Sequence, residues 1–139
     1  MDLGNYFLST MARILLIDDD EMLRTVLAIA IDAAGHEVLQ AEDGQKGMEL
    51  VRTTSVDLVI TDLIMPVQEG VETIMTLRRE RPRLPVIAMS GGASNSKLYL
   101  DIAGKIGAKR MLPKPFTPRQ LVALITEILA EEKPRSGSI

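Results

Sequence analysis

The sequence contains no cysteine and a single histidine, and both absences narrow the chemistry that the chain can support. Without cysteine there can be no disulfide, no thiolate metal site and no cysteine nucleophile, and the chain is compatible with a reducing compartment. One histidine cannot form a histidine metal cluster. His36 stands in residues 34–37, between a predicted helix and a predicted strand, so we expect it to lie on an exposed connection.

Strong positive charge and long apolar runs are also missing. The formal net charge is -3 at pH 7, which argues against sequence-independent binding of nucleic acid, because such binding needs a basic surface. Arginines do gather at residues 78–83, near a predicted helix end, where the helix dipole favours cations. We interpret these arginines as a solvated face. No apolar run approaches the roughly 20 residues of a membrane span, so we expect contact with neither nucleic acid nor membrane.

The length of the chain suits one globular domain. Its 139 residues are 46% hydrophobic, and a domain of this size buries roughly two thirds of its unfolded surface. Residues 1–10 have no basic leader and too short an apolar core for a secretory signal, and Met11 directly precedes the first strand-like run. We therefore expect an N-terminal extension at 1–12. Residues 133–139 are polar with proline and glycine and are predicted to be a frayed tail, which leaves 13–132 as the domain.

Short apolar runs alternate along the chain with segments of helical periodicity. The predicted strands are residues 14–17, 38–39, 56–60, 86–89 and 111–112. The predicted helices are residues 22–34, 44–51, 71–77, 98–106 and 118–129. The longer strands are largely continuous apolar runs, as expected of strands that are covered on both faces. This alternation predicts an α/β fold, a doubly wound five-stranded parallel sheet with five helices.

Several predicted helices carry end signals and apolar rows. Gly35 is placed to end the first helix. Thr117 can cap the last helix, Pro118 suits its first position, and Gln120 completes a capping box. The first helix has two adjacent apolar rows, one with Leu23, Leu27 and Ile31 and the other with Met22, Val26, Ala30 and Ala34. The apolar face expected in the fourth helix consists of Leu98, Ile102 and Ile106.

Polar residues of complementary chemistry follow four of the predicted strands. They are Asp18-Asp19-Asp20, Asp62, Ser90 and Lys114. The carboxyl ends of parallel strands share one edge of the sheet, where ligands bind, so we expect these residues to form one site. The glycine fingerprint of dinucleotide-binding folds is absent after the first strand, and the acids that stand there would repel phosphate without a cation. The set predicts a hard cation beside a carboxylate nucleophile, as phosphoryl transfer to an aspartate requires.

The segment from Arg13 to about Glu132 resembles the receiver domain of two-component response regulators. The resemblance is carried by Ile17-Asp18-Asp19-Asp20, Thr61-Asp62-Leu63-Ile64-Met65-Pro66, Gly70, Ala88-Met89-Ser90 and Lys114-Pro115-Phe116. It implies a flavodoxin-like strand order, 2-1-3-4-5. It further implies a cytoplasmic signalling module that takes a phosphoryl group from a sensor histidine kinase or phosphotransfer protein, and then changes its surface for a downstream partner. Such a module catalyses only its own phosphorylation and dephosphorylation.

The resemblance also implies a Mg²⁺ site. Asp19 would bind the ion directly, together with Asp62 and the backbone carbonyl of Ile64, and Asp18 would act through a coordinated water. So few protein ligands are chemically sensible, because Mg²⁺ usually keeps several waters in its coordination shell. Successive acids also favour a helix N-terminus, and we assign that capping role to Asp20. A register shifted by one residue is also compatible with the acidic triplet.

The remaining roles implied by the resemblance concern the phosphoryl group itself. Asp62 would accept it, the Lys114 ammonium would pair with one of its oxygens, and the Ser90 hydroxyl would move to hydrogen-bond it. The peptide before Pro115 is cis in the family, whereas only about 5 to 6% of all such bonds are. Each residue also has an ordinary interpretation: Asp62 as a turn residue, Lys114 as a surface lysine and Ser90 as a helix cap before Gly91.

The chain departs from the family pattern at two places. Met111 occupies a position that is often aromatic in the family. An aromatic ring there takes one of two distinct positions, whereas a flexible thioether can fill the space without being confined to two. We therefore predict a softer switch that involves Ser90 and Met111. Ile64 and Gly92 stand where members with fast turnover carry polar groups near the attacking water, so we predict slow self-dephosphorylation.

Parts of the sequence also suit two other functions. A haloacid dehalogenase-like phosphohydrolase would use Asp18 and Asp20, which are suitably spaced. Against this function, Glu21-Met22 lacks the expected Thr or Val, no downstream acid pair is evident, and Asp62 is left unexplained. A pseudo-receiver that is never phosphorylated would not need the acids, the hydroxyl and the lysine. We expect a monomer or weak dimer, either a stand-alone regulator or a piece of a longer protein.

Overall fold

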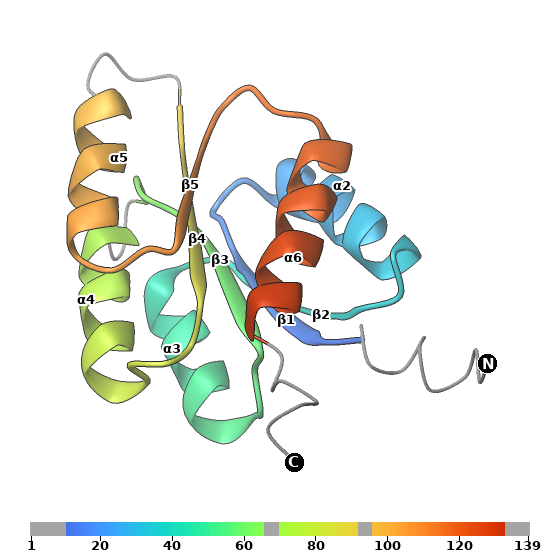
Figure 1. Ribbon diagram of the computed structural model, residues 1–139, viewed down its shortest axis with the longest axis horizontal. Coiled ribbons are helices and arrows are strands. Elements are labelled where there is room, and N and C mark those ends of the chain that lie inside the picture. The colour runs from blue at the N-terminus through green and yellow to red at the C-terminus, as the bar shows by residue number, and fades with distance from the viewer. Residues whose placement is uncertain (1–10, 66–69, 92–95, 133–139) are drawn as a thin grey trace.

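The computed structural model describes residues 11–65, 70–91 and 96–132 (Figure 1). Its elements are β1 (Arg13–Ile17), α2 (Glu21–Ala33), β2 (Glu37–Ala41), α3 (Gly44–Thr53), β3 (Leu58–Asp62), α4 (Gly70–Glu80), β4 (Val86–Ser90), α5 (Ser96–Lys105), β5 (Arg110–Pro113) and α6 (Pro118–Glu132). The strands form one sheet in the order β2-β1-β3-β4-β5, and every neighbouring pair is parallel. The predicted fold class and strand order are confirmed.

Two helical layers cover the sheet (Figure 1). Helices α3, α4 and α5 lie on one face, over a core that includes Leu15, Val59 and Val86. Helices α2 and α6 lie on the other face, over a core that includes Leu16 and Ile60. Alternate residues of the same strand thus enter opposite cores, which explains why the central strands are apolar throughout.

The strand register brings the polar residues to one edge. Ile17 pairs with Thr61 across β1 and β3, so Asp18 and Asp62, the next residue on each strand path, emerge side by side. On the outer side, Ser90 pairs with Pro113 of β5, and Lys114 follows directly. Four short pieces that are far apart in the sequence are therefore neighbours because of the parallel register alone.

The predicted helix caps are present. The Asp20 carboxylate accepts a hydrogen bond from the Leu23 amide at 3.1 Å. The Thr117 hydroxyl accepts from the Gln120 amide, and the Gln120 side chain accepts from the Thr117 amide, which completes the capping box. Gly35 ends α2 with a φ of 98°, a left-handed conformation that favours glycine.

Two helical faces differ from the predicted ones. On α2 the buried residues are Leu27, Ala28 and Ile31, whereas Met22 is 78% exposed, because the helix has the sheet on one side only. On α5 the predicted Leu98 is 57% exposed, whereas the predicted Ile106, just after the helix, does pack on the core. The residues of α5 that pack on the core include Tyr99 and Ala103. Apolar spacing located both helices but did not fix which of two adjacent rows faces the sheet.

The expectation of an exposed His36 is wrong. The side chain is only 6% exposed, and its Nδ1 accepts a hydrogen bond from the Ala12 amide at 3.2 Å. Burial lowers the pKa of His36, which agrees with a neutral ring that accepts through Nδ1. His36 therefore fastens the residue before β1 to the start of β2.

The interpretation of the arginine cluster as a solvated face is wrong for Arg78. Its guanidinium donates to the carbonyls of Pro82 and Leu84 and so braces the turn between α4 and β4. Arg81 and Arg83 are exposed, as expected.

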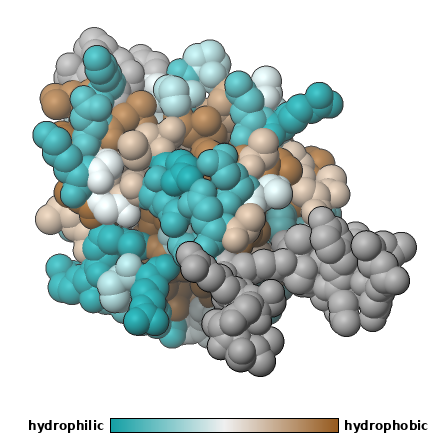
Figure 2. Space-filling model, in the orientation of Figure 1, coloured by the Kyte–Doolittle hydropathy of each residue, from teal (hydrophilic) through white to brown (hydrophobic). Residues whose placement is uncertain are grey.

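Figure 2 shows hydrophilic side chains at the centre of the face that Figure 1 presents, over α6 and its neighbour β5. Ion pairs join Arg110 of β5 to Glu127 and Glu131 of α6, and Lys109, just before β5, to Glu131 and Glu132. Among the described helices, none is both long and apolar enough to cross a bilayer.

Candidate functional site

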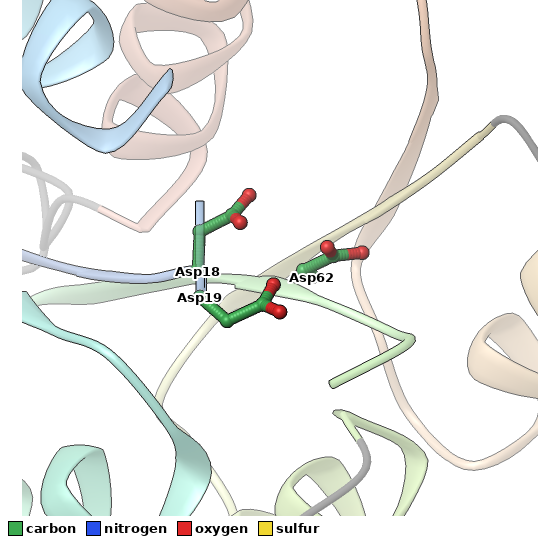
Figure 3. A group of neighbouring side chains, drawn as sticks. All are labelled: Asp18, Asp19 and Asp62. Carbon is green, nitrogen blue, oxygen red and sulfur yellow. The ribbon is translucent and has the colours of Figure 1, made fainter. Parts of the chain in front are cut away.

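Three carboxylates converge at the carboxyl edge of the sheet (Figure 3). One oxygen from each of Asp18, Asp19 and Asp62 lies within 4.8 Å of the others. Asp18 is fully buried and Asp62 is 7% exposed, whereas Asp19 is exposed to solvent. Oxygen donors at this separation suit a hard cation that keeps part of its water shell, so the residues present fit Mg²⁺.

Asp18 is held rigidly. Its Oδ1 accepts from the Asp20 amide at 2.9 Å, and its backbone carbonyl accepts from Arg24 of α2 at 2.7 Å. Burial raises the pKa of Asp18, and the nearby Asp62 raises it further, while the Asp20 amide and Lys114 lower it. The net effect is a raised pKa, and burial is its largest cause.

Lys114 supplies the one ammonium that the described residues place in this cluster. Its Nζ lies 3.3 Å from Asp62 Oδ2 and 3.4 Å from Asp18 Oδ2. Burial lowers the pKa of Lys114, but Asp62 and Asp18 together raise it more, and the net pKa is raised. The Lys114–Pro115 peptide is cis, as the resemblance implied. The structure thus brings the predicted lysine to both buried carboxylates.

Ser90 lies at the same edge with an unused hydroxyl. It is fully buried, and its Oγ finds no hydrogen-bond partner among the described residues. Ser90 is the last residue of β4, and no described helix begins at it, so the structure does not support the alternative that it is a helix cap. A buried hydroxyl without a partner costs free energy, about 1–3 kcal/mol. Such a group marks a place where a polar ligand atom would be stabilised.

The start of α4 lies tightly against the end of β3. A side chain added at Gly70 would meet the Asp62 carbonyl oxygen at 2.0 Å, so only glycine allows α4 to start this close. Ile64 is 38% exposed, and its amide is 3.4 Å from Asp62 Oδ1. Ile64 thus lies next to Asp62 at the rim of the site. Gly92, which together with Ile64 led to the prediction of slow self-dephosphorylation, lies outside the described residues.

Met111 lies on β5 and packs against α5. It is 41% exposed, and a Cβ added at Gly104 would meet its Cε at 3.1 Å. The thioether therefore lies in a slot that a small residue leaves open.

Sequence reasoning missed two residues of the site, Arg24 and Gly91. Arg24 holds the Asp18 carbonyl, and its only signal is its position one turn after the capping Asp20. Gly91 lies against Lys114, a contact between β4 and the end of β5 that no local pattern reveals.

Comparison with known proteins agrees with this arrangement. Residues 14–126 match the family model of the response regulator receiver domain. Among solved structures, the chain is similar to a CheY-like response regulator receiver domain protein from Methanospirillum hungatei, with a TM-score of 0.82 and 28% identity. That alignment covers 88% of this chain and 96% of the other.

Two curated relatives are longer proteins. The chain is 40% identical over 119 residues to the transcriptional regulatory protein CpxR of Klebsiella pneumoniae, covering 86% of this chain and 50% of CpxR. It is 38% identical over 125 residues to the DNA-binding transcriptional regulator NtrC of a Bradyrhizobium species, covering 90% of this chain and 26% of NtrC. The chain therefore spans half or less of the length of these relatives.

The carboxylate geometry predicts that Mg²⁺ stabilises the folded chain. Binding to the folded state alone should raise the free energy of unfolding by about 1.4 kcal/mol when Mg²⁺ is tenfold above its dissociation constant. Thermal unfolding with and without Mg²⁺ measures this effect. Asp19→Asn should abolish it, whereas Asp20→Asn is the matched control, because asparagine also caps helices and Asp20 lies outside the carboxylate group. An equal loss in both variants would contradict the assignment.

Proposed function

The chain belongs to the response regulator receiver domain family, and from this premise we propose that Asp62 accepts a phosphoryl group from a phosphohistidine. The donor would be a sensor histidine kinase or a phosphotransfer protein, and the modified domain would present a changed surface to a downstream protein. The observation that carries this proposal is the position of Lys114 Nζ, 3.3 Å from Asp62 in a cluster with Asp18 and Asp19. The chain would act as a signalling module rather than a metabolic enzyme.

The chemistry assigned to Asp62 is a displacement at phosphorus. A carboxylate oxygen of Asp62 forms the new P–O bond while the P–N bond to the imidazole breaks, and the electron pair returns to the imidazole nitrogen. Asp62 keeps 7% of its surface exposed, and the donor would have to reach it there. Lys114 would pair with a phosphoryl oxygen in place of one of the two carboxylates that it now contacts.

Cation charge is essential to this step. A phosphorylated side chain adds about -1.5 to -2 of charge, and Asp18 and Asp19 already stand beside Asp62. Mg²⁺ bound there would offset the charge on the transferring group. Asp19, Asp62 and the carbonyl of Ile64 would hold the ion directly, and Asp18 would act through a water. The rigid hold on Asp18 by Asp20 and Arg24 keeps that carboxylate in place.

The boundaries and setting of the module follow from the same proposal. The described elements from Arg13 to Glu132 would form the receiver unit, acting in the cytoplasm as a monomer or weak dimer. The phosphohydrolase alternative is disfavoured, because Asp20, which it would need beside Asp18, caps α2 instead. A pseudo-receiver is disfavoured by the ammonium placed against two buried carboxylates and by the unused Ser90 hydroxyl.

We predict that incubation with acetyl phosphate and Mg²⁺ attaches an acid-labile phosphoryl group to Asp62. Labelling and intact-protein mass spectrometry should show one added group on the wild type and none on Asp62→Asn, which keeps the shape of the side chain but lacks the nucleophile. Removal of Mg²⁺ should abolish labelling. Equal labelling of the wild type and Asp62→Asn would contradict the proposal.

We predict that the phosphoryl group is lost slowly in the absence of a phosphatase. The Ile64 side chain at the rim of the site cannot orient an attacking water. Ile64→Asn should speed the loss several-fold, whereas the apolar control Ile64→Val should leave it unchanged, in a time course followed by phosphate release. Rapid loss from the wild-type protein with Mg²⁺ would contradict this prediction.

We predict a soft switch at Ser90 and Met111. The Ser90 hydroxyl should turn to the phosphoryl group, and the flexible Met111 thioether should then adopt several positions rather than two. Crystal structures with and without a beryllofluoride mimic measure this directly. A clean two-position Met111 that moves together with Ser90 would rule out the soft version.

A further inference from the structure

A second apolar row runs along helix α2, on the side that faces away from the sheet. Met22, Val26, Ile29 and Ala33 follow one another at intervals of four, three and four residues, so they form one stripe of the helix. Met22 is 78% exposed, Val26 46% and Ile29 65%, and Ala33 is exposed as well. A surface helix ordinarily turns a polar face to solvent, so this exposed apolar stripe indicates a surface that another segment covers.

The elements that pack on α2 leave the apolar stripe uncovered. Among the described elements, β1, β2 and α6 make the main contacts with the helix. Leu27, Ala28 and Ile31 fill the core beneath it. Arg24, the one basic residue of the helix, donates to the Asp18 carbonyl at 2.7 Å and so is engaged at the edge of the sheet. The stripe therefore suits an apolar occupant.

The chain enters the fold close to the end of this helix. Ala12 is only 7% exposed and belongs to the core beneath α2, together with Ile31. The Ala12 amide donates at 3.2 Å to Nδ1 of His36, which lies three residues after the end of α2. Met11, one residue earlier, is 52% exposed. Residues 1–10, which lie outside the described residues, thus join the fold next to the C-terminal end of the stripe.

Residues 1–10 suit the stripe in composition and in length. They include Leu3, Tyr6, Phe7 and Leu8, and Asp2 is their only charged side chain. Tyr6 and Phe7 are half of the tyrosines and phenylalanines in the chain, and aromatic side chains bury a large apolar area each. Ten residues reach at most about 33–36 Å, whereas the 13 residues of α2 span about 20 Å. The segment can therefore reach every residue of the stripe.

We propose that residues 3–8 lie along α2 and cover the stripe of Met22, Val26 and Ile29. The occupant belongs to the same chain, so its effective concentration is high and modest contacts are enough to hold it. The stripe begins three residues after Asp19, beside the group of carboxylates. A protein that binds this face of α2 has to displace the segment, so the contact is autoinhibitory toward such a partner. The inference does not depend on phosphorylation of Asp62.

Oxidation of methionines by hydrogen peroxide in the full chain tests the contact. Peroxide transfers one oxygen atom to a thioether and leaves as water, and peptide mass spectrometry follows the rate at each methionine. Met75 of α4 is 52% exposed and lies on the other helical layer, so it serves as the internal standard (Figure 1). We expect Met22 to be oxidised several-fold more slowly than Met75, because the segment covers it, although Met22 is the more exposed of the two in the described fold.

Substitutions in the segment identify the occupant. Tyr6→Ser combined with Phe7→Ser should raise the oxidation rate of Met22 at least to that of Met75, because serine lacks the apolar area that holds the segment down. Both positions precede β1, so the core is untouched. The matched control Ser9→Ala should change neither rate. In methyl NMR, the Ile29 signals should lose the ring-current shift of Phe7 in the serine variant only.

Each result decides the proposal. Protection of Met22 that is independent of protein concentration and is lost with Tyr6 and Phe7 would support it. Oxidation of Met22 as fast as that of Met75 in the wild type would overturn it, and so would protection that the serine variant retains. An equal gain in Ser9→Ala would also count against it. Protection that disappears on dilution would replace the segment with a second copy of the chain as the occupant.

Discussion

The site depends on one electrostatic constraint, the proximity of two buried carboxylates. Asp18 and Asp62 are brought together by the pairing of β1 with β3, and neither can move away without breaking the strand register. Two unit charges about 4 Å apart interact by about 4 kcal/mol at an effective dielectric constant near 20. Positive charge must therefore be supplied nearby. Lys114 provides part of it, and the grouping of Asp19 with the other two carboxylates suits a divalent cation for the rest.

Much of the surrounding structure serves to keep this charge balance fixed. Asp20 contributes its amide to Asp18 and its carboxylate to the first turn of α2, so one residue both orients the site and starts the helix beside it. Gly70 lets α4 begin against the backbone of Asp62. These contacts are made by backbone groups or short side chains, which lose little conformational entropy when they are held.

The sequence predicted the features that depend on local pattern. Continuous apolar strands and their polar ends were enough to predict a parallel sheet with Asp62, Asp18 and Lys114 at one edge, because the parallel register turns chain position into spatial position. The strand order was predicted only from the resemblance to receiver domains. Features that depend on distances between elements were not predicted. His36 is buried, and its Nδ1 accepts from the amide of Ala12, the residue just before β1. The buried row of α5 lies one residue away from Leu98, since the spacing alone allowed both rows.

The long contacts of the Lys114 ammonium suit a site whose hydrogen bonds rearrange when a ligand binds. At 3.3 and 3.4 Å, the ammonium is shared between two carboxylates at the long end of the hydrogen-bond range rather than tightly paired with one. Beside it, the buried Ser90 hydroxyl is not satisfied by any described residue. An arrangement optimised for stability alone would pair both groups fully. The backbones of Lys114 and Ser90 are hydrogen-bonded to each other. If Asp62 is phosphorylated as proposed, the ammonium and the hydroxyl would both gain from the new oxygens there, and that gain would be the free energy available to shift the surrounding surface.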